Sequence, residues 1–173
     1  MGDPLFVVVS GPPGSGKSTL ACALAPHLCL PLIAKDTIKE ALMSVLPVPD
    51  VRASRDLGRG AVVAMLAVAS DSTVGGVLEA PFQRTLAAPG LRDLPGRIVE
   101  LFCRCERAGA AERYRERAAT RHPGHLDLGR TIDELWNDEV IEPVAGGWPV
   151  LEGDTNAPVD LGPVIHFVRT SAG

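Results

Sequence analysis

Short apolar runs alternate with amphipathic segments from one end of the chain to the other. The apolar runs have the length of strands, whereas the segments between them repeat apolar residues at helical spacing. The predicted strands are residues 5–10, 31–34, 74–80, 97–105 and 150–152, and the predicted helices are residues 17–29, 54–69, 108–121, 128–142 and 160–169, with a further helix opening at residues 35–40. Strands that alternate with helices predict a parallel sheet with right-handed crossover connections.

Several residues predict where helices begin and end. Pro26 predicts that the first helix kinks or ends early, because proline cannot donate to the helical hydrogen-bond ladder. Asp36 or Thr37 can cap the second helix, and Ser54 is placed to cap the long helix that follows. Residues 91–96 are predicted to form a loop.

One stretch carries a specific chemical signature. Residues 11–19 read GPPGSGKST, which matches the pattern G-x-x-x-x-G-K-[ST] between a predicted strand and a predicted helix. Such a loop points backbone N–H groups at one spot, and the helix N-terminus adds positive potential there. Lys17 would reach the outer phosphates of a nucleoside triphosphate, and the Ser18 hydroxyl would bind Mg²⁺. The candidate nucleotide-binding residues are Gly11, Pro12, Pro13, Gly14, Ser15, Gly16, Lys17, Ser18 and Thr19.

Candidate catalytic residues follow the next predicted strands, and ligands of parallel sheets bind outside the carboxyl ends of strands. Asp36 could accept the proton of an attacking hydroxyl and orient it towards the terminal phosphate; a helix cap is the alternative. Lys39, about one turn later, could hold an anionic part of the acceptor or be solvated surface. Glu79 ends an apolar strand, where a buried carboxylate needs Mg²⁺, an acceptor hydroxyl or an arginine as its partner.

Three arginines recur every four residues in a predicted helix: Arg113, Arg117 and Arg121. Like charges at this spacing repel each other across one helix face. A polyphosphate facing them would relieve that repulsion and stabilise charge on a transferring group, whereas a solvated helix face is the alternative. Because residues 122–125 read HPGH, we expect a movable lid over about residues 113–127.

Composition narrows the class of protein. The length of 173 residues predicts one domain, and the net charge of −4 with 4% aromatic residues counts against nucleic-acid binding. No apolar run is long enough for a membrane span and no signal pattern opens the chain, so we expect a cytoplasmic monomer or homodimer without membrane contact. The cysteines lack zinc-ligand spacing and predict reduced core thiols; they are Cys22, Cys29, Cys103 and Cys105.

Together these motifs resemble the P-loop kinases of the group that contains chloramphenicol phosphotransferase, gluconate kinase, zeta toxins and the kinase domain of polynucleotide kinase. The resemblance covers nearly the whole chain, is most specific at GPPGSGKST, and extends to uncharacterised small AAA-domain proteins. It implies an α/β, three-layer P-loop NTPase fold, with a five-stranded parallel sheet flanked by helices and a helical lid. Asp36 stands where that group has its acceptor-activating aspartate, and Lys39 replaces an arginine.

The resemblance extends to the second half of the chain. Residues 117–125 are similar to the lid of gluconate-kinase-like enzymes, and Glu142-Pro143 is similar to the end of the helix that follows that lid. Residues 154–160, DTNAPVD, resemble the group's adenine loop, which makes Thr155 and Pro158 candidate nucleotide contacts; a plain strand-to-helix turn is the alternative.

The acceptor is expected to bind in a helical region of about residues 37–72. Residues 44–70 are mostly apolar with few charges, which mildly favours an uncharged, bulky acceptor, and Arg55 is a candidate acceptor contact. Gly58 and Gly60 lower helix propensity by about 1 kcal/mol each, so either a ligand or a second helix is expected to approach them closely.

The sequence therefore predicts an ATP- and Mg²⁺-dependent kinase that transfers the γ-phosphoryl group to a hydroxyl of a small molecule, such as an antibiotic, a sugar or a nucleoside. The predicted catalytic residues are Lys17, Asp36, Arg117 and Arg121; the predicted acceptor contacts are Asp36, Lys39, Arg55 and Glu79; the predicted metal ligands are Ser18 and Glu79. A polynucleotide or nucleotide-sugar kinase of the zeta-toxin type, or an ATPase switch without an acceptor, are the alternatives.

Overall fold

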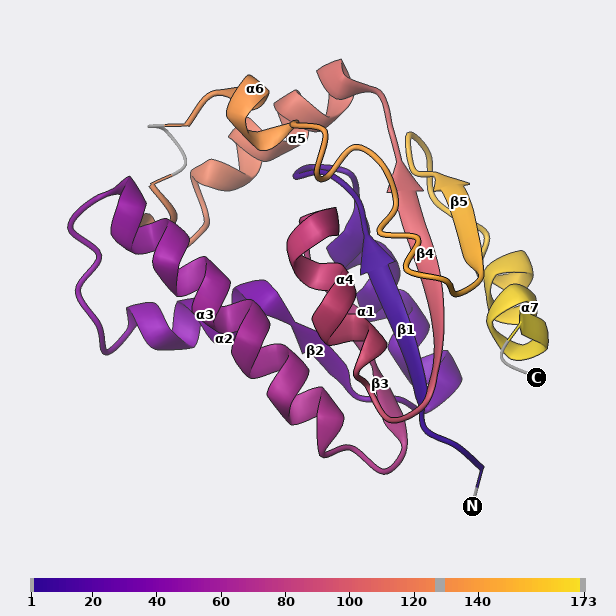
Figure 1. Cartoon of the computed structure of the whole chain (residues 1–173). Coiled ribbons are helices and arrows are strands. Elements are labelled where there is room, and N and C mark those ends of the chain that lie inside the picture. The colour runs from indigo at the N-terminus through magenta and orange to yellow at the C-terminus, as the bar shows by residue number, and fades with distance from the viewer. Residues whose placement is uncertain (1, 127–129, 172–173) are drawn as a thin grey trace.

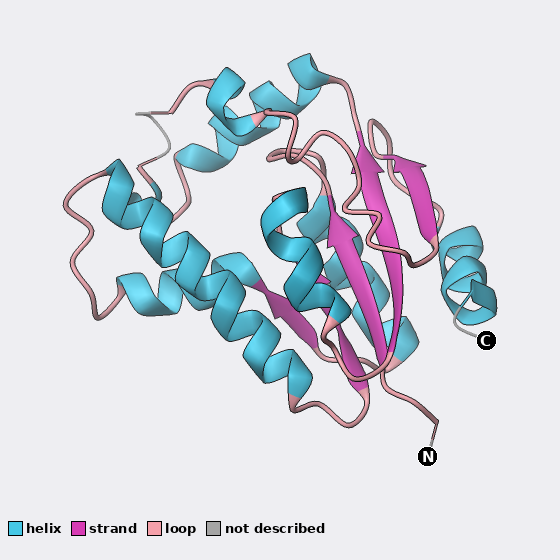
Figure 2. Ribbon diagram, viewed as in Figure 1, coloured by secondary structure: helices cyan, strands magenta, loops and turns pink. Residues whose placement is uncertain are grey.

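A five-stranded, fully parallel sheet forms the centre of the molecule in the computed structural model, which describes residues 2–126 and 130–171. The strand order is β2-β3-β1-β4-β5 (Figures 1 and 2). The strands are β1 (Leu5–Ser10), β2 (Leu32–Ala34), β3 (Gly75–Glu79), β4 (Arg97–Arg104) and β5 (Val150–Asp154). The sequence-based prediction of a five-stranded parallel sheet is confirmed.

Helices cover both faces of this sheet, which gives the predicted three layers. They are α1 (Lys17–Leu28), α2 (Lys35–Met43), α3 (Val51–Ser70), α4 (Arg84–Arg92), α5 (Arg107–Ala118), α6 (Ile132–Leu135) and α7 (Leu161–Ser171), with the 3-10 turn η1 (Pro123–His125) between α5 and α6. Helices α1 and α7 pack on one face, and α3 and α4 pack on the other (Figure 1).

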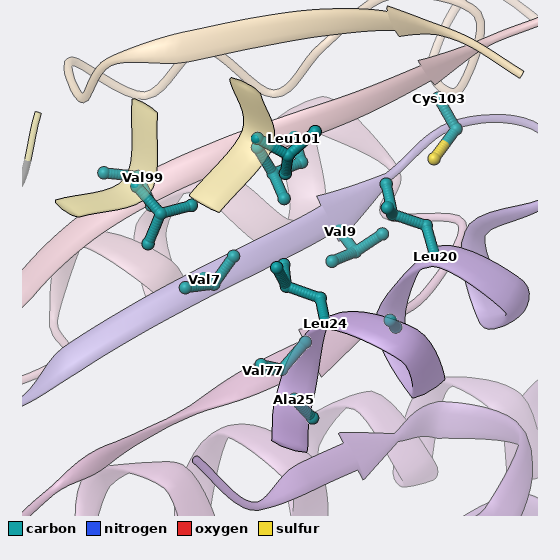
Figure 3. Close-up of a cluster of buried hydrophobic side chains, with 12 residues drawn as sticks. Val7, Val9, Leu20, Leu24, Ala25, Val77, Val99, Leu101 and Cys103 are labelled. Carbon is teal, nitrogen blue, oxygen red and sulfur yellow. The ribbon is translucent and has the colours of Figure 1, made fainter. Parts of the chain in front are cut away.

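The central strand β1 shows why the sheet is buried on both faces. Its side chains from Phe6 to Val9 have no exposed area. Successive side chains of a strand face opposite sides, so Val7 and Val9 join the core under α1 and α7, whereas Phe6 and Val8 join the core under α3 and α4. Figure 3 shows Leu24 of α1 packed in the first of these cores. Each such burial contributes roughly 1.5–3 kcal/mol, which holds the loops at the strand ends in fixed positions.

Helix α2 begins differently from the prediction. It starts at Lys35, directly after β2, with Ala34 in the capping position and no side-chain cap. The prediction that Asp36 or Thr37 caps this helix is therefore wrong. Because the strand runs straight into the helix, Asp36 lies in the first helical turn and its carboxylate is available to other partners.

Helix α3 begins one turn earlier than predicted. Asp50 is its cap, since the Asp50 carboxylate accepts a hydrogen bond of 2.8 Å from the backbone N–H of Ala53. Ser54, predicted as the cap, is buried inside the helix instead.

Two other predicted helix boundaries, both based on prolines or glycines, differ from those in the structure. Helix α1 continues past Pro26 to Leu28, because the burial of the helix against the sheet offsets the one hydrogen bond that proline removes. The predicted loop 91–96 is wrong at its start, since α4 ends at Arg92. This helix was not predicted because it contains Pro89 and Gly90, yet Leu91 within it is fully buried.

The predicted helix 128–142 is wrong over most of its length. Residues 128 and 129 lie outside the described residues, and of the remainder only α6 is an α-helix, so Glu142-Pro143 does not end one. The chain after α6 is held by contacts that are distant in sequence. The Glu139 carboxylate accepts hydrogen bonds of 2.8 Å from the N–H and from the hydroxyl of Thr85. Such tertiary contacts override local helix propensity.

A fully buried carboxylate, Glu100 of β4, anchors the rest of this connection. One of its oxygens accepts hydrogen bonds from the Ser10 hydroxyl (2.6 Å) and the Val144 N–H (2.8 Å). The other accepts from the Ala145 N–H (2.9 Å) and the Trp148 indole N–H (3.0 Å). Glu100 thereby links the end of β1, just before the GPPGSGKST loop, to the segment that precedes β5.

The cysteines divide into two kinds. All four are free, and Cys103 is buried, where desolvation raises the pKa of its thiol to about 12. Cys22 and Cys29 are exposed, so the prediction of core thiols is wrong for these two.

The carboxyl ends of the strands point towards α5 and α6 (Figure 1). This is the edge at which the candidate residues were expected to meet. In the described ranges, no helix combines the length and the apolar character that crossing a membrane requires.

Candidate active site

The GPPGSGKST loop joins β1 to α1 and packs closely against the backbone of β4 and α5. Gly11 and Gly14 have φ values of 131° and 81°, in the region that favours glycine. A Cβ at Gly14 would lie 2.2 Å from the carbonyl oxygen of Ala110, and one at Gly11 would lie 2.7 Å from that of Cys103. Gly16 precedes α1 without any side-chain cap, so the first N–H groups of the helix face the concave side of the loop.

Lys17 is buried inside the loop that it belongs to. Its ammonium donates a hydrogen bond of 2.7 Å to the carbonyl oxygen of Pro12. Burial lowers the pKa of Lys17, and the nearby charge of Glu79 opposes this shift in part. The Ser15 hydroxyl is also buried and has no hydrogen-bond partner in the described part of the chain. A bound anion would supply partners that the loop alone lacks.

Asp36 lies between two cations at the start of α2. Its carboxylate oxygens lie 2.8 Å from the Lys35 ammonium and 2.6 Å from a terminal nitrogen of Arg121. Burial alone would raise the pKa of Asp36, but the charges of Lys35 and Arg121 outweigh it and hold the pKa well below its usual range. Asp36 is therefore an oriented carboxylate that stays ionised.

Lys39, one turn after Asp36, is 5% exposed. Its ammonium donates a hydrogen bond of 2.8 Å to the Ser54 hydroxyl, which in turn donates one of 3.4 Å to the carbonyl oxygen of His125. Burial, aided by the nearby charge of Lys35, lowers the pKa of Lys39 to about 8. Gly58 of α3 lies beside the Lys39 stem, since a Cβ there would be 3.9 Å from it, whereas a Cβ at Gly60 would meet nothing.

Glu79 ends β3 and is 5% exposed. Burial raises its pKa, and the charge of Lys17 opposes that shift. Within residues 2–126 and 130–171, no cluster of three His, Cys, Asp or Glu side chains forms a metal cage. Mg²⁺ needs no such cage, because it is usually bound by one or two protein oxygens together with phosphate oxygens and water. The Ser18 hydroxyl and the Glu79 carboxylate line the same cavity and fit this donor set.

The cavity brings most of the candidate residues together. The predicted residues that line it are Pro13, Gly14, Gly16, Lys17, Ser18, Asp36, Lys39, Glu79, Arg117 and Arg121. They come from the loop after β1, from α2, from the end of β3 and from the segment that begins with α5, which are far apart in sequence.

Three residues that follow α5 in the chain contact the elements that line this cavity. Arg121 lies beyond the end of α5, which stops at Ala118, and pairs with Asp36. The His125 ring lies 2.8 Å from the Glu40 carboxylate. Trp136 donates an indole hydrogen bond of 3.0 Å to the carbonyl oxygen of Pro13 in the phosphate loop.

The whole chain is similar to a solved structure from Chloroflexus aurantiacus J-10-fl that is described as a proposed kinase. The two chains are 29% identical, the match covers 98% of this chain and 99% of that one, and the TM-score is 0.85. The GPPGSGKST loop lies at the carboxyl edge of the same parallel sheet that the two chains share. Over nearly its whole length the chain therefore shares the fold of P-loop kinases.

More distant P-loop kinases share the fold. Shikimate kinase from Acinetobacter baumannii is 19% identical over 98% of this chain and 94% of that one, with a TM-score of 0.63. An adenylate kinase from Chlamydia caviae is 33% identical over 105 residues, which make up 60% of this chain and 43% of that protein. The match thus spans less than half of the length of this curated relative. No protein-family profile matches the sequence.

Two predicted nucleotide contacts flank the GPPGSGKST loop outside the cavity. Arg113 donates a hydrogen bond of 3.2 Å to the carbonyl oxygen of Thr155, so the two residues form one wall. A side chain at Gly16 would lie 3.5 Å from Thr155 and 3.8 Å from Arg113. Pro158 is exposed on the loop after β5, and Thr19 is exposed on α1.

The surroundings of four predicted residues differ from those expected. Three are the arginines predicted to share one helix face, and the fourth is the predicted acceptor contact Arg55. Arg113 binds Thr155, Arg117 lines the cavity and Arg121 pairs with Asp36, so the three arginines do not form one continuous face. Arg55 is outside the cavity lining, because it is exposed on α3 and lies 3.3 Å from the Glu134 carboxylate.

Sequence reasoning missed part of the cavity wall. The additional lining residues are Lys35, Pro81, Tyr114, His125, Arg130 and Leu135. Lys35 could have been suspected because it adjoins Asp36. No motif marks Arg130, because its place in the wall depends on how the chain returns after η1.

Proposed function

We propose that this protein is a P-loop kinase that uses ATP to phosphorylate a hydroxyl group of a small molecule. One observation carries the proposal: the oriented carboxylate of Asp36 lines the same cavity as Lys17 of the phosphate loop. A nucleotide-binding switch without an acceptor would need the loop and its lysine, but it would not need a partly buried carboxylate held in place by two cations beside them.

The donor side of the proposed reaction consists of groups that bind phosphate. The backbone N–H groups of residues 14–19, which include the N-terminus of α1, would bind the phosphate oxygens, and Lys17 would exchange the Pro12 carbonyl for the terminal phosphates. Ser18 and Glu79 would hold Mg²⁺, which neutralises charge on the phosphates when it is bound. Arg117 would place its charge next to the transferring group.

On the acceptor side, Asp36 would receive the hydrogen bond of the attacking hydroxyl. The transition state of phosphoryl transfer is loose, so orientation in line with the leaving oxygen matters more than strong basicity. A carboxylate with a depressed pKa suits this role, since it stays ionised and its two cations fix its direction. The proton would pass to Asp36 as the acceptor oxygen bonds to the γ-phosphorus, while the bond from that phosphorus to the β,γ-bridging oxygen breaks and ADP leaves.

Two substitutions separate nucleotide binding from transfer. We expect Lys17→Ala to weaken ATP binding strongly and to abolish acceptor-dependent ADP release. Asp36→Asn should leave the Kd for ATP within about threefold of wild type while lowering kcat by at least about a hundredfold. Calorimetry with a non-hydrolysable ATP analogue and a coupled ADP assay measure the two effects. Full turnover by Asp36→Asn would refute the role of Asp36.

A phosphate acceptor is the second candidate. It is favoured by the 33% identity to an adenylate kinase over 105 residues, because adenylate offers a phosphate oxygen as the acceptor. A phosphate oxygen is already ionised at neutral pH and has no proton to give up. Retention of kcat by Asp36→Asn with adenylate, but not with hydroxyl acceptors, would favour this alternative.

A further inference from the structure

Two cationic side chains of the cavity wall have no anionic partner among the residues that the structure describes. Within residues 2–126 and 130–171, the Lys39 ammonium of α2 donates a hydrogen bond only to the neutral Ser54 hydroxyl. The Nε atom of Arg130, which follows η1 in the chain, is buried and has no hydrogen-bond partner in the same described ranges. Among the described residues, no carboxylate lies within ion-pair distance of either side chain.

The other cationic side chains of the cavity already have an ion-pair partner or a proposed role. Lys35 and Arg121 pair with Asp36, and Lys17 and Arg117 are proposed to face the phosphates of ATP. In all, six cationic and two anionic side chains line the cavity; the cations are Lys17, Lys35, Lys39, Arg117, Arg121 and Arg130, and the anions are Asp36 and Glu79. Magnesium-bound ATP brings a charge of only about −2, so a positive surplus remains.

A buried cation without a partner is costly, and a protein usually keeps one only where a ligand supplies the missing charge. The geometry also limits where that charge would be. Lys39 stands three residues after Asp36 on α2, so both side chains lie on the same side of the helix. The Lys39 ammonium has three N–H donors, of which the Ser54 hydroxyl takes one.

We propose that the acceptor carries an anionic group, a carboxylate or a phosphate, that Lys39 and Arg130 bind a few bonds away from the hydroxyl oriented by Asp36. This inference rests on the proposed kinase function and names the class of its acceptor. It differs from the sequence-based expectation of an uncharged acceptor, because the basic residues come from α2 and from the chain after the lid rather than from residues 44–70.

Anion binding tests the site without knowledge of the natural acceptor. With the donor site filled by ADP, Mg²⁺ and beryllium fluoride, citrate and glycerol 3-phosphate are titrated into the protein by calorimetry. We expect wild type to bind at least one of them, and Lys39→Met and Arg130→Met each to weaken that binding by about tenfold or more. Arg59→Met is the matched control, because Arg59 is exposed on the same helix as Ser54 and pairs with Asp56. Equal binding by Lys39→Met and wild type, or no binding by wild type, would overturn the proposal.

Turnover measurements distinguish an acceptor with a carboxylate from an acceptor with a phosphate. They also test this inference separately from the kinase proposal. Acceptors are compared in sets that share a skeleton: glycerol, glycerate and glycerol 3-phosphate, or glucose, gluconate and glucose 6-phosphate. The proposal predicts phosphorylation of a carboxylate or phosphate member over its neutral counterpart, and a KM raised by about tenfold in Lys39→Met but restored in part by Lys39→Arg. Preferred use of neutral members would refute it. Anion binding that depends on Lys39 without any turnover would support the anion site and count against the kinase.

Discussion

Asp36 owes its properties to the two cations that flank it. Lys35 adjoins it in sequence, whereas Arg121 reaches it from beyond the end of α5. The sequence indicated Asp36 from its place after a strand, yet it could not show that both cations hold its carboxylate. That arrangement depends on the course of the chain between α5 and η1.

Replacement of Arg121 tests this arrangement. Because the folded-state pKa of Asp36 is depressed, its carboxylate stays ionised at every pH above that pKa, and protonation of Asp36 should cause no fall of wild-type kcat/KM through the usual carboxylate range. In Arg121→Met one of the two cations is lost, so the pKa of Asp36 rises and the acid limb of the pH profile moves upward, while kcat falls by about tenfold or more. Arg115→Met, an exposed substitution on α5, should change neither. An unmoved acid limb in Arg121→Met would contradict the account.

Lys39 gives a second pH dependence, on the basic side. Its pKa is lowered to about 8 by burial and by the cations near it, so the ammonium loses its proton as the pH rises past that value. The charged and titratable groups around it are Lys35, Asp36, Arg121, His125 and Arg130. For an anionic acceptor, KM should therefore rise by up to about tenfold per pH unit above pH 8. Lys39→Arg should remove this rise, because arginine stays charged; its persistence in that variant would assign it to another group.

At the scale of elements, the sequence predicted the helices and strands whose positions follow from the residue pattern nearby in the chain. The strands and the long amphipathic helices follow from apolar periodicity alone. The chain between α5 and β5 does not, because its course depends on contacts from far away: Trp136 to Pro13, Glu139 to Thr85, and Glu100 to residues 144–148. Of the helix predicted there, only four of the residues that the structure describes are α-helical.

Glu100 is the main anchor of that connection. Glu100→Ala leaves two backbone N–H groups and two side-chain donors buried without their acceptor, and each costs about 1–3 kcal/mol. We expect the free energy of unfolding to fall by at least about 3 kcal/mol, measured by urea denaturation. The exposed Glu142→Ala is the control and should change it by less than about 0.5 kcal/mol. A loss below 1 kcal/mol in Glu100→Ala would show that the connection is held by other contacts.

For the molecule as a whole, the sequence was sufficient to predict the fold and the place of the GPPGSGKST loop in it. One motif and one strand–helix alternation predicted a parallel sheet with a phosphate loop at its carboxyl edge, and the structure places both there. The acceptor side was harder to predict. Its positive charge comes from residues such as Lys39 and Arg130, which are 91 positions apart and show no shared pattern. Only the folded chain brings them to one cavity.

The most direct test of the proposed function follows the γ-phosphoryl group itself. Wild type is incubated with γ-labelled ATP, Mg²⁺ and the anionic and neutral acceptor sets, and the products are separated. The account predicts that the label moves to an acceptor hydroxyl in a one-to-one ratio with ADP, and that Asp36→Asn loses this transfer while still binding ATP. If the label appeared only as inorganic phosphate, at a rate unaffected by every acceptor, the protein would be an ATPase and the central claim would be wrong.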